Sequence, residues 1–206
     1  MKSILQILIQ VVFLGLFILL IVIGKIQLWI GIFIAGVLIS FLLGRIYCGW
    51  ICPINTVMNG ITWVKNKLHI KNLKTPVFLA KPWVRYLVFG LFVAVFIFTI
   101  ISHKKLPVLP ALFVIGILFT FFFPEELWHR YLCPYGTLMS FPASKAKHAM
   151  FINQDQCNHC GTCLHECPSK AVAKIDDQEK IIKSGCLVCM KCVKKCNQNA
   201  ISIKRY

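Results

Sequence analysis

Eight cysteines within forty residues constrain this chain more than any other feature. They form two groups of four, and in each group two, two and three residues separate successive cysteines. With this spacing a short loop wraps three sulfurs around one iron-sulfur cluster, and the fourth sulfur reaches the neighbouring cluster. The spacing therefore predicts two 4Fe-4S clusters with crossed ligation. We expect Cys157, Cys160, Cys163 and Cys196 to bind the first cluster, and Cys186, Cys189, Cys192 and Cys167 to bind the second.

Zinc and disulfides are the other ordinary uses of so many cysteines. Structural zinc sites normally combine two separated cysteine pairs, whereas the first group here places four cysteines within eleven residues. Disulfide frameworks are typical of small secreted domains, and the charge pattern described below places these thiols in the reducing cytoplasm. Both alternatives are therefore disfavoured against iron-sulfur clusters.

The cysteine-rich segment also resembles the bacterial two-cluster ferredoxins. Gly161 follows the second cysteine of the first group, and the sequence CPSKAV at 167–172 recurs as CNQNAI at 196–201. Asn197 is a departure, because these ferredoxins usually have proline after the corresponding cysteine. The resemblance implies that residues 151–206 form a small α+β domain built from two similar halves.

Four long apolar runs precede this segment. They cover residues 4–23, 26–43, 84–101 and 106–123, in a chain that is 58% hydrophobic with a mean hydropathy of +0.73. Each run is long enough to cross a bilayer as a helix. The first run lacks a small-residue cleavage site and exceeds the length of a signal h-region, so we interpret it as an uncleaved anchor. We expect residues 1–150 to form a membrane domain with four transmembrane helices.

The net charge of +16 bears on orientation in the membrane more than on nucleic-acid binding. Residues 44–83 contain no acidic residue and carry Arg45, Lys65, Lys67, Lys71, Lys74 and Lys81. The positive-inside rule then puts this loop, both termini and the cysteine-rich domain in the cytoplasm, although Lys104 and Lys105 in the outer connection argue the other way. We expect the cationic loop at 65–81 to lie against anionic headgroups, with an acidic redox partner as the alternative.

A repeated motif follows each pair of apolar runs. Residues 48–58 contain Cys-x3-Cys-Pro, and residues 129–139 contain His-x3-Cys-Pro at the aligned positions. Because two spans return the chain to the same side, the repeats are expected to be parallel. Cys-x3-Cys-Pro after paired spans, repeated and followed by a two-cluster ferredoxin segment, resembles the membrane-bound polyferredoxins of the NapH and NosR type. That resemblance implies electron transfer at the membrane, linking quinol or a cytoplasmic donor to a redox enzyme or a maturation system.

The motif residues could also form a third metal site. Cysteine and histidine replace one another in many metal sites, so a Cys3His set could hold a metal or a further cluster. The alternative is that the Cys-Pro turns end helices and the cysteines pack as small hydrophobic residues. The candidate ligands are Cys48, Cys52, His129 and Cys133.

Other polar residues carry weaker signals. Glu125, Glu126 and His129 lie where a quinol would release protons, yet ordinary surface residues at the end of a span are the simpler interpretation. His159 and His165 could tune the first cluster through hydrogen bonds to sulfur, and we do not expect them to bind iron.

These inferences define one principal hypothesis, a multi-pass protein of a bacterial or archaeal cytoplasmic membrane that passes single electrons to a partner redox protein. Its alternative is a metal-handling or maturation factor, for instance in copper reduction, that uses the Cys/His set. A cluster-bearing sensor or anchor is a third interpretation. The chain shows no Ser-His-Asp arrangement, phosphate-binding loop or nucleotide fingerprint, so an electron-transfer component is expected rather than a stand-alone enzyme.

Overall fold

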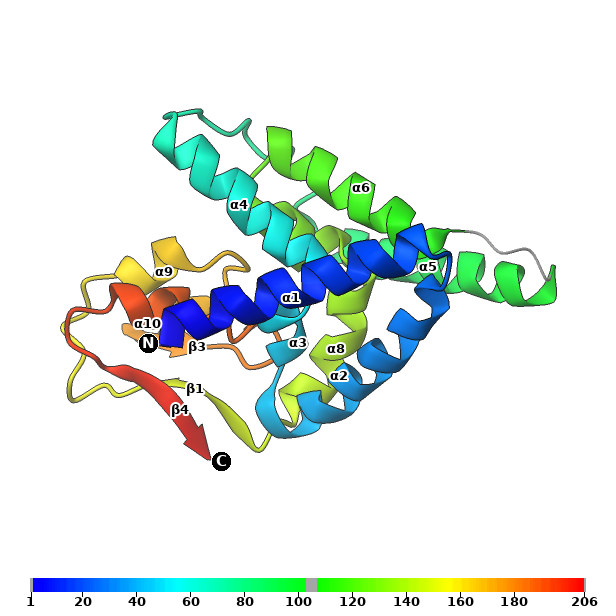
Figure 1. The fold of residues 1–206 in the computed structure, drawn as a ribbon. Coiled ribbons are helices and arrows are strands. Elements are labelled where there is room, and N and C mark those ends of the chain that lie inside the picture. The colour runs from blue at the N-terminus through cyan, green and yellow to red at the C-terminus, as the bar shows by residue number, and fades with distance from the viewer. Residues whose placement is uncertain (1, 103–106, 206) are drawn as a thin grey trace. The chain divides into compact units, whose positions relative to one another are not determined.

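The computed structural model describes residues 2–102 and 107–205, so the connection with His103, Lys104 and Lys105 lies outside the described residues. The chain divides into two compact units, and each is described by itself below (Figure 1). The first unit comprises residues 1–52 and 139–206, and the second comprises residues 53–138.

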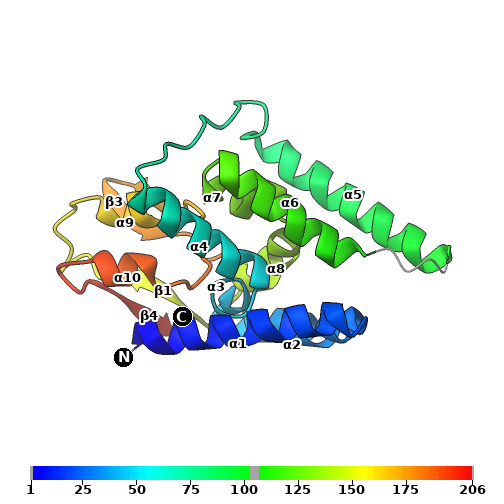
Figure 2. The same ribbon diagram turned by 45° about the horizontal axis from the view of Figure 1, so that its top comes forward.

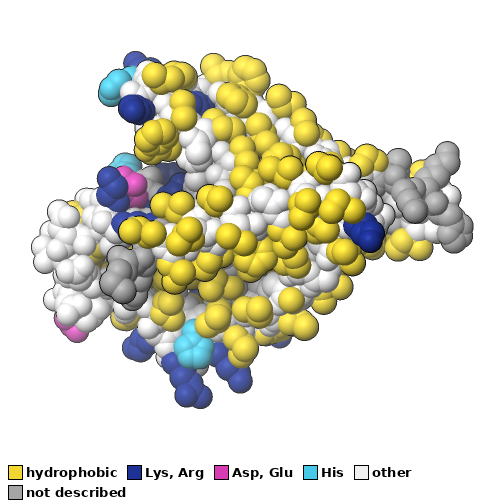
Figure 3. Space-filling view, viewed as in Figure 1, with side chains coloured by type: hydrophobic (Ala, Val, Ile, Leu, Met, Phe, Trp, Pro, Cys, Tyr) yellow, Lys and Arg dark blue, Asp and Glu magenta, His cyan; other side chains and the backbone are white. Residues whose placement is uncertain are grey.

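Two apolar helical segments open the first unit. Helix α1 (Lys2–Val22) is followed by η1 (Ile26–Leu28), which leads directly into α2 (Trp29–Leu43). Residues 4–22 and 26–43 are each long and apolar enough to cross a membrane. Their outward side chains are uncovered, and Figure 3 shows apolar groups along the visible face of α1. Such continuous apolar surface is expected of helices whose solvent is lipid.

The cysteine-rich segment of the first unit contains two small antiparallel sheets and two short helices. Strand β1 (His148–Ile152) pairs with β4 (Ile201–Arg205), and β2 (Val172–Ile175) pairs with β3 (Gln178–Ile181). Asp176 and Asp177 connect β2 to β3 with positive φ angles of 53° and 59°, as a type I′ hairpin turn requires. Helices α9 (Thr162–Glu166) and α10 (Lys191–Lys195) each begin one residue before the third cysteine of a group. Figure 2 shows the two helices beside the strands.

The second unit is helical throughout its regular structure. It contains α4 (Pro53–Lys67), α5 (Pro82–Ile101), α6 (Val108–Phe122), α7 (Glu125–Leu127) and the π-helix η2 (Trp128–Leu132), and its boundary falls inside α8 (Pro134–Ser144). Helix α5 is long and apolar enough to cross a membrane, whereas α6 is apolar but only 15 residues long. The described residues thus contain three helices of membrane-spanning length and a shorter apolar one.

Both units contain the same local arrangement around the repeated motif. In α2 the Ser40 hydroxyl donates to the Gly36 carbonyl, and in α6 the Thr120 hydroxyl donates to the Gly116 carbonyl, both at 2.8 Å. An aromatic ring lies against each glycine, Tyr47 against Gly36 and Trp128 against Gly116. A β-carbon added at Gly36 would lie 2.7 Å from the Tyr47 ring, so the small residue makes room for the aromatic one.

Both motifs also end in the same backbone hydrogen bond. The Cys52 amide donates to the Tyr47 carbonyl, and the Cys133 amide donates to the Trp128 carbonyl, each across five residues and at 2.9 Å. Proline follows at once and begins the next helix, which is a favourable first helical position because proline needs no amide partner there. This π-type widening of the last turn turns the chain sharply at each Cys-Pro pair.

Lys65 departs from the expectation that residues 65–81 form a solvated cationic surface. Its side chain is buried, with 6% of the residue exposed, and its ammonium donates to the Thr120 and Phe121 carbonyls at 3.1 Å and to Asn72. These carbonyls belong to the last turn of α6, where the helix offers no amide partners. Burial lowers the pKa of Lys65. The expectation was therefore wrong for Lys65, which ties α4 to α6, while Lys67, Lys71 and Lys74 are exposed.

Candidate functional site

The first unit contains one cavity for each predicted cysteine set. One cavity is lined by Cys157, Cys160, Cys163 and Cys196, together with Glu179. A second cavity is lined by Cys167, Cys186, Cys189 and Cys192. In both cavities the fourth cysteine comes from the other group along the chain. The structure thus brings together the cysteines that the spacing predicted to act together.

The two cysteine loops share an unusual backbone path. His159 and Val188 precede the second cysteine of their loops with φ angles of 54° and 53°, and Gly161 and Met190 follow it with φ angles of 71° and 59°. A positive φ is strained for a β-branched residue such as Val188. Each loop accepts this strain to curl around its cavity, so the three sulfurs of one loop face the same space.

Burial acts on the thiols in a way that suits a cationic centre. It raises the pKa of Cys163 to about 11 and that of Cys186 to about 12, because a thiolate loses hydration inside the protein. Iron supplies the positive charge that a buried thiolate needs. Backbone amides add support, since the Ala171 amide donates to the Cys167 sulfur at 3.2 Å. The donor set, two cavities with four cysteines each, fits two 4Fe-4S clusters.

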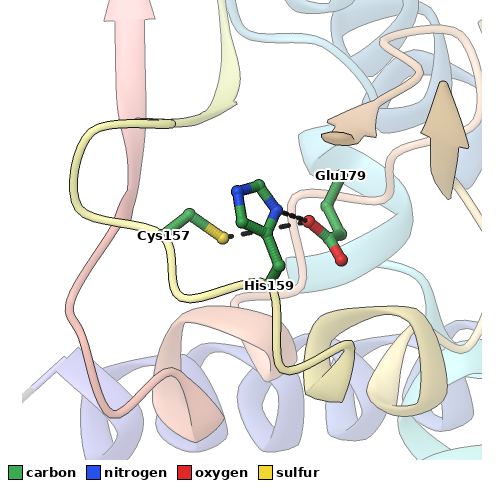
Figure 4. Close-up of side chains that lie close together, drawn as sticks. All are labelled: Cys157, His159 and Glu179. Carbon is green, nitrogen blue, oxygen red and sulfur yellow. Dashed lines mark hydrogen bonds and ion pairs between the residues drawn. The ribbon is translucent and has the colours of Figure 1, made fainter. Parts of the chain in front are cut away.

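Glu179 is a residue of the first cavity that the cysteine motif does not contain. Its side chain is only 3% exposed, and its carboxylate lies 2.6 Å from His159 Nδ1 and 3.9 Å from the Cys157 sulfur (Figure 4). The hydrogen bond to His159 lowers the pKa of Glu179. His159 therefore pairs with a buried acid and not with a sulfur, as the sequence had suggested it could, and His165 is exposed on α9.

The loop that lines the second cavity contacts the N-terminal helical segment of the same unit. Helix α3 (Ile46–Trp50) packs against the loop 187–189, and the Trp50 indole donates to the Val188 carbonyl at 2.9 Å. Gly49 permits this approach, because a β-carbon there would lie 2.3 Å from the Leu187 carbonyl oxygen. The second cysteine group is thus in direct contact with the first Cys-x3-Cys-Pro motif.

Two glutamines of α1 reinforce this contact. The side-chain amides of Gln6 and Gln10 donate to the Gly49 carbonyl at 3.2 and 2.9 Å, and Gln6 also donates to the Cys189 carbonyl at 3.1 Å. Lys194 of α10 donates in turn to the Gln6 side-chain oxygen at 3.2 Å. Both ribbon views place the first half of α1 beside α3 and α10 (Figures 1 and 2). Polar groups on an otherwise apolar helix therefore bind the cysteine-rich segment.

Half of the predicted Cys3His set lies in the first unit. Cys48 is buried with Tyr47, Met139 and Leu187, and its sulfur lies 3.6 Å from the Met139 sulfur. Cys52 packs against the same cluster. The first half of the set is therefore surrounded mainly by apolar and sulfur groups.

The other half of the set, His129 and Cys133, belongs to the second unit. The Cys133 sulfur accepts a hydrogen bond from the Gly136 amide at 3.3 Å, at the start of α8. His129 and Glu125 are buried, with 7% and 6% exposure. The simpler interpretation, that Glu125 and His129 are ordinary surface residues, was therefore wrong, because both lie inside the second unit.

Two iron-sulfur family models match the chain. A 4Fe-4S binding domain matches residues 26–71 and 106–149, and a 4Fe-4S dicluster domain matches residues 149–197. No solved structure matches. The first model covers the two segments that carry the repeated motif, and the second covers both cysteine groups.

Several curated relatives share most of this chain. A Methanocaldococcus jannaschii protein is 29% identical over 180 residues, which are 84% of this chain and 70% of the relative. The Escherichia coli protein provisionally named electron transport protein YccM is 27% identical (79% and 52%), and the ferredoxin-type protein NapH of Haemophilus influenzae is 26% identical (81% and 64%). The chain thus spans between about half and two thirds of the length of YccM and NapH.

These matches and the two cysteine cavities define an iron-sulfur protein of the ferredoxin type, related to electron transport proteins. Its long apolar helices make it a membrane protein. Within this class the chain is a NapH-like polyferredoxin, which confirms the resemblance seen in its motifs.

Proposed function

We propose that this protein passes single electrons between quinol or a cytoplasmic donor and a partner redox protein, through two 4Fe-4S clusters. The observation that carries the proposal is the pair of cavities, each lined by four cysteines from both groups. When bound, such clusters accept and release one electron at a time. The relatives named for electron transport and as ferredoxin-type proteins support this choice.

The cluster ligands follow from the cavity linings. Cys157, Cys160, Cys163 and Cys196 would hold the first cluster, and Cys167, Cys186, Cys189 and Cys192 the second. Leu187 and Val188, which are 1% and 5% exposed, exclude water from the second site. Trp50 and Gly49 hold the loop of that site against α3, so the second cluster would lie on the membrane side of the pair.

The proposed architecture is four transmembrane helices in two parallel repeats over residues 1–150, and a ferredoxin domain over 151–206. The matching glycine, hydroxyl and aromatic positions around the two motifs support an internal repeat. The contact between the first Cys-Pro motif and the second cysteine group supports placing both on one side of a membrane. The basic residues at 44–83 favour the cytoplasmic side of a bacterial or archaeal inner membrane.

A direct test uses the full chain purified in detergent and loaded with iron and sulfide. Iron and sulfide analysis should give eight of each per chain if two 4Fe-4S clusters form. Addition of a reduced menaquinol analogue should then bleach the cluster absorbance if quinol is the donor. Bleaching by dithionite but not by the quinol would remove the quinol branch and leave a cytoplasmic donor. A chain that binds no iron would refute the whole proposal.

Orientation has its own test. A reporter that is active only in the periplasm, fused after Tyr206, should be inactive, and the same reporter inserted in the connection at 103–105 should be active. The reverse pattern would place the ferredoxin domain outside.

A metal-handling role is the second candidate, and one contact favours it. The Cys48 and Met139 sulfurs lie 3.6 Å apart in a buried cluster, and thiolate with thioether is a ligand pair that suits Cu(I). The ligand set predicted from the sequence is Cys48, Cys52, His129 and Cys133, and Met139 is a further candidate ligand. Copper binding should then be measured by competition with a Cu(I) chelator, in the wild type and in Cys48→Ser and Met139→Leu variants. Equal copper content in all three proteins would eliminate this role.

A further inference from the structure

Arg45 is a buried arginine at the junction of α2 and α3. Only 2% of the residue is exposed, and its Nη1 donates to the Ser184 carbonyl at 3.4 Å. Its Nε is buried without a hydrogen-bond partner, and no carboxylate in the described part of the chain forms an ion pair with it. A guanidinium remains charged in proteins, and a buried charge without a counter-ion is costly.

The position of Arg45 identifies what can compensate this charge. Ser184 lies two residues before Cys186, and the residues on either side of Arg45 touch the same cysteine-rich core. A β-carbon on Gly44 would lie 3.6 Å from a Val188 methyl group, and Ile46 packs on the cluster that includes Val188 and Cys186.

The first cavity has the opposite charge beside it. Glu179 lines that cavity, is buried, and lies 3.9 Å from the Cys157 sulfur. A 4Fe-4S cluster with four thiolates is negatively charged, and accepting one electron adds one more negative charge. A fixed positive charge near one site and a fixed negative charge near the other therefore separate the two sites in reduction potential.

We propose that Arg45 sets the reduction potential of the cluster site formed by Cys167, Cys186, Cys189 and Cys192, and makes it the site where a single electron rests. Glu179 acts in the same sense, because it disfavours the added electron at the first site. The donor loses one electron and the second site gains it, with no bond made or broken. This inference rests on the proposed function, since it requires both clusters to be present.

The first site is more exposed to solvent, and this exposure would raise its reduction potential relative to that of the second site. Cys160 is exposed, and water stabilises the added negative charge of a reduced cluster. The charges of Arg45 and Glu179 outweigh this effect of solvent, because they act inside the protein. At an effective dielectric constant of about 20, the interaction of a unit charge with a cluster is several times stronger than in water. Both charged groups are buried, so this advantage applies to each of them.

The test is a potentiometric titration of the iron-loaded full chain, followed by electron paramagnetic resonance with redox mediators. Arg45→Gln keeps a donor for the Ser184 carbonyl and removes the charge. Arg45→Gln should lower the reduction potential of the second cluster by at least about 59 mV, which is a tenfold shift towards the oxidised form for a one-electron couple. The reduction potential of the first cluster should not change. Arg45→Lys should lie nearer to the wild type than Arg45→Gln. Arg205→Gln removes the same charge from an exposed strand position and should change neither potential.

A second measurement keeps the proposal testable if Arg45→Gln loses iron. The double variant Cys157→Ser, Cys160→Ser should retain only the second cluster, and Cys186→Ser, Cys189→Ser only the first. The first of these double variants should titrate with the higher of the two wild-type potentials. A higher potential at the first site, or two unmoved potentials in an iron-replete Arg45→Gln protein, would overturn the proposal. Absence of clusters from the wild type would instead refute the proposed function.

Discussion

Replacing Gly49 with alanine tests the contact between α3 and the second cysteine loop. The new β-carbon would lie 2.3 Å from the Leu187 carbonyl oxygen and 3.1 Å from the Cys189 backbone, so the loop must move by about 1 Å to reach ordinary contact. Overpacking of this kind costs about 1–3 kcal/mol. The movement would also break the Trp50–Val188 hydrogen bond, which adds about 1 kcal/mol.

Helix propensity acts in the opposite direction. Alanine is more favourable than glycine inside a helix by about 1 kcal/mol. The net loss for Gly49→Ala is therefore about 1–3 kcal/mol, a large part of the stability of a typical domain, which is about 5–15 kcal/mol. Gly31→Ala is the matched control, because Gly31 lies in α2 of the same unit and nothing lies within 4 Å of its added β-carbon.

The assay combines hydrogen exchange with iron analysis. Gly49→Ala should increase amide exchange across residues 186–192 and lower the iron content of the second site, while the first site keeps its signal. Gly31→Ala should match or slightly exceed the wild type in thermal stability. Wild-type exchange and full iron content in Gly49→Ala would show that the close packing of α3 on this loop does not stabilise the site.

Three further changes have distinct expected results. Cys167→Ser should abolish the signal of the cluster bound by the second group and spare the cluster of its own group, as the cavity linings require; loss of the other signal would mean uncrossed ligation. Lys65→Met should destabilise the second unit by about 1–3 kcal/mol, because it leaves helix carbonyls unpaired, whereas exposed Lys67→Met should change thermal unfolding little. Glu179→Gln should raise the reduction potential of the first cluster, and an unchanged potential would exclude Glu179 from tuning it.

The cysteine sets could be predicted from the sequence because loop geometry depends on local spacing. Three sulfurs separated by two residues each must face one space if the loop is to bind one cluster, and the same spacing recurs in the second group. The family was predictable for a related reason, since the Cys-Pro motifs and apolar runs are short, contiguous signals.

Arg45 and Glu179 could not be assigned from the sequence, because their roles depend on packing between distant segments. Arg45 appeared only as one of several basic residues in a cytoplasmic loop, and its burial depends on contact with residue 184. For Glu179 the sequence contains one weak indication. Successive side chains of a strand point to opposite faces, so Glu179 must point away from the face that Gln178 and Lys180 share. Which of the two faces is buried could not be predicted without knowing how β2 pairs with β3 and packs in the unit.

Buried polar residues of the second unit were also hidden. Glu125 and His129 follow a span and read as surface groups, but η2 widens into a π-helix and carries His129 inwards. Lys65 was grouped with the exposed lysines because the sequence shows its charge but not its hydrogen-bond partners at the end of α6. In each case tertiary contact overrode the average behaviour of the residue type.

The hydrogen bonds of Gln6 have a consequence for biosynthesis. Gln6 is translated long before its partner Cys189, which lies 183 residues further along the chain. Both glutamine amides can donate to the Gly49 carbonyl as soon as α3 has been made, whereas the Gln6–Cys189 hydrogen bond forms only after the ferredoxin domain has been translated. The contact of α1 with α3 is thus available early in synthesis, and its contact with the second cysteine loop is completed only by one of the last segments of the chain to be made.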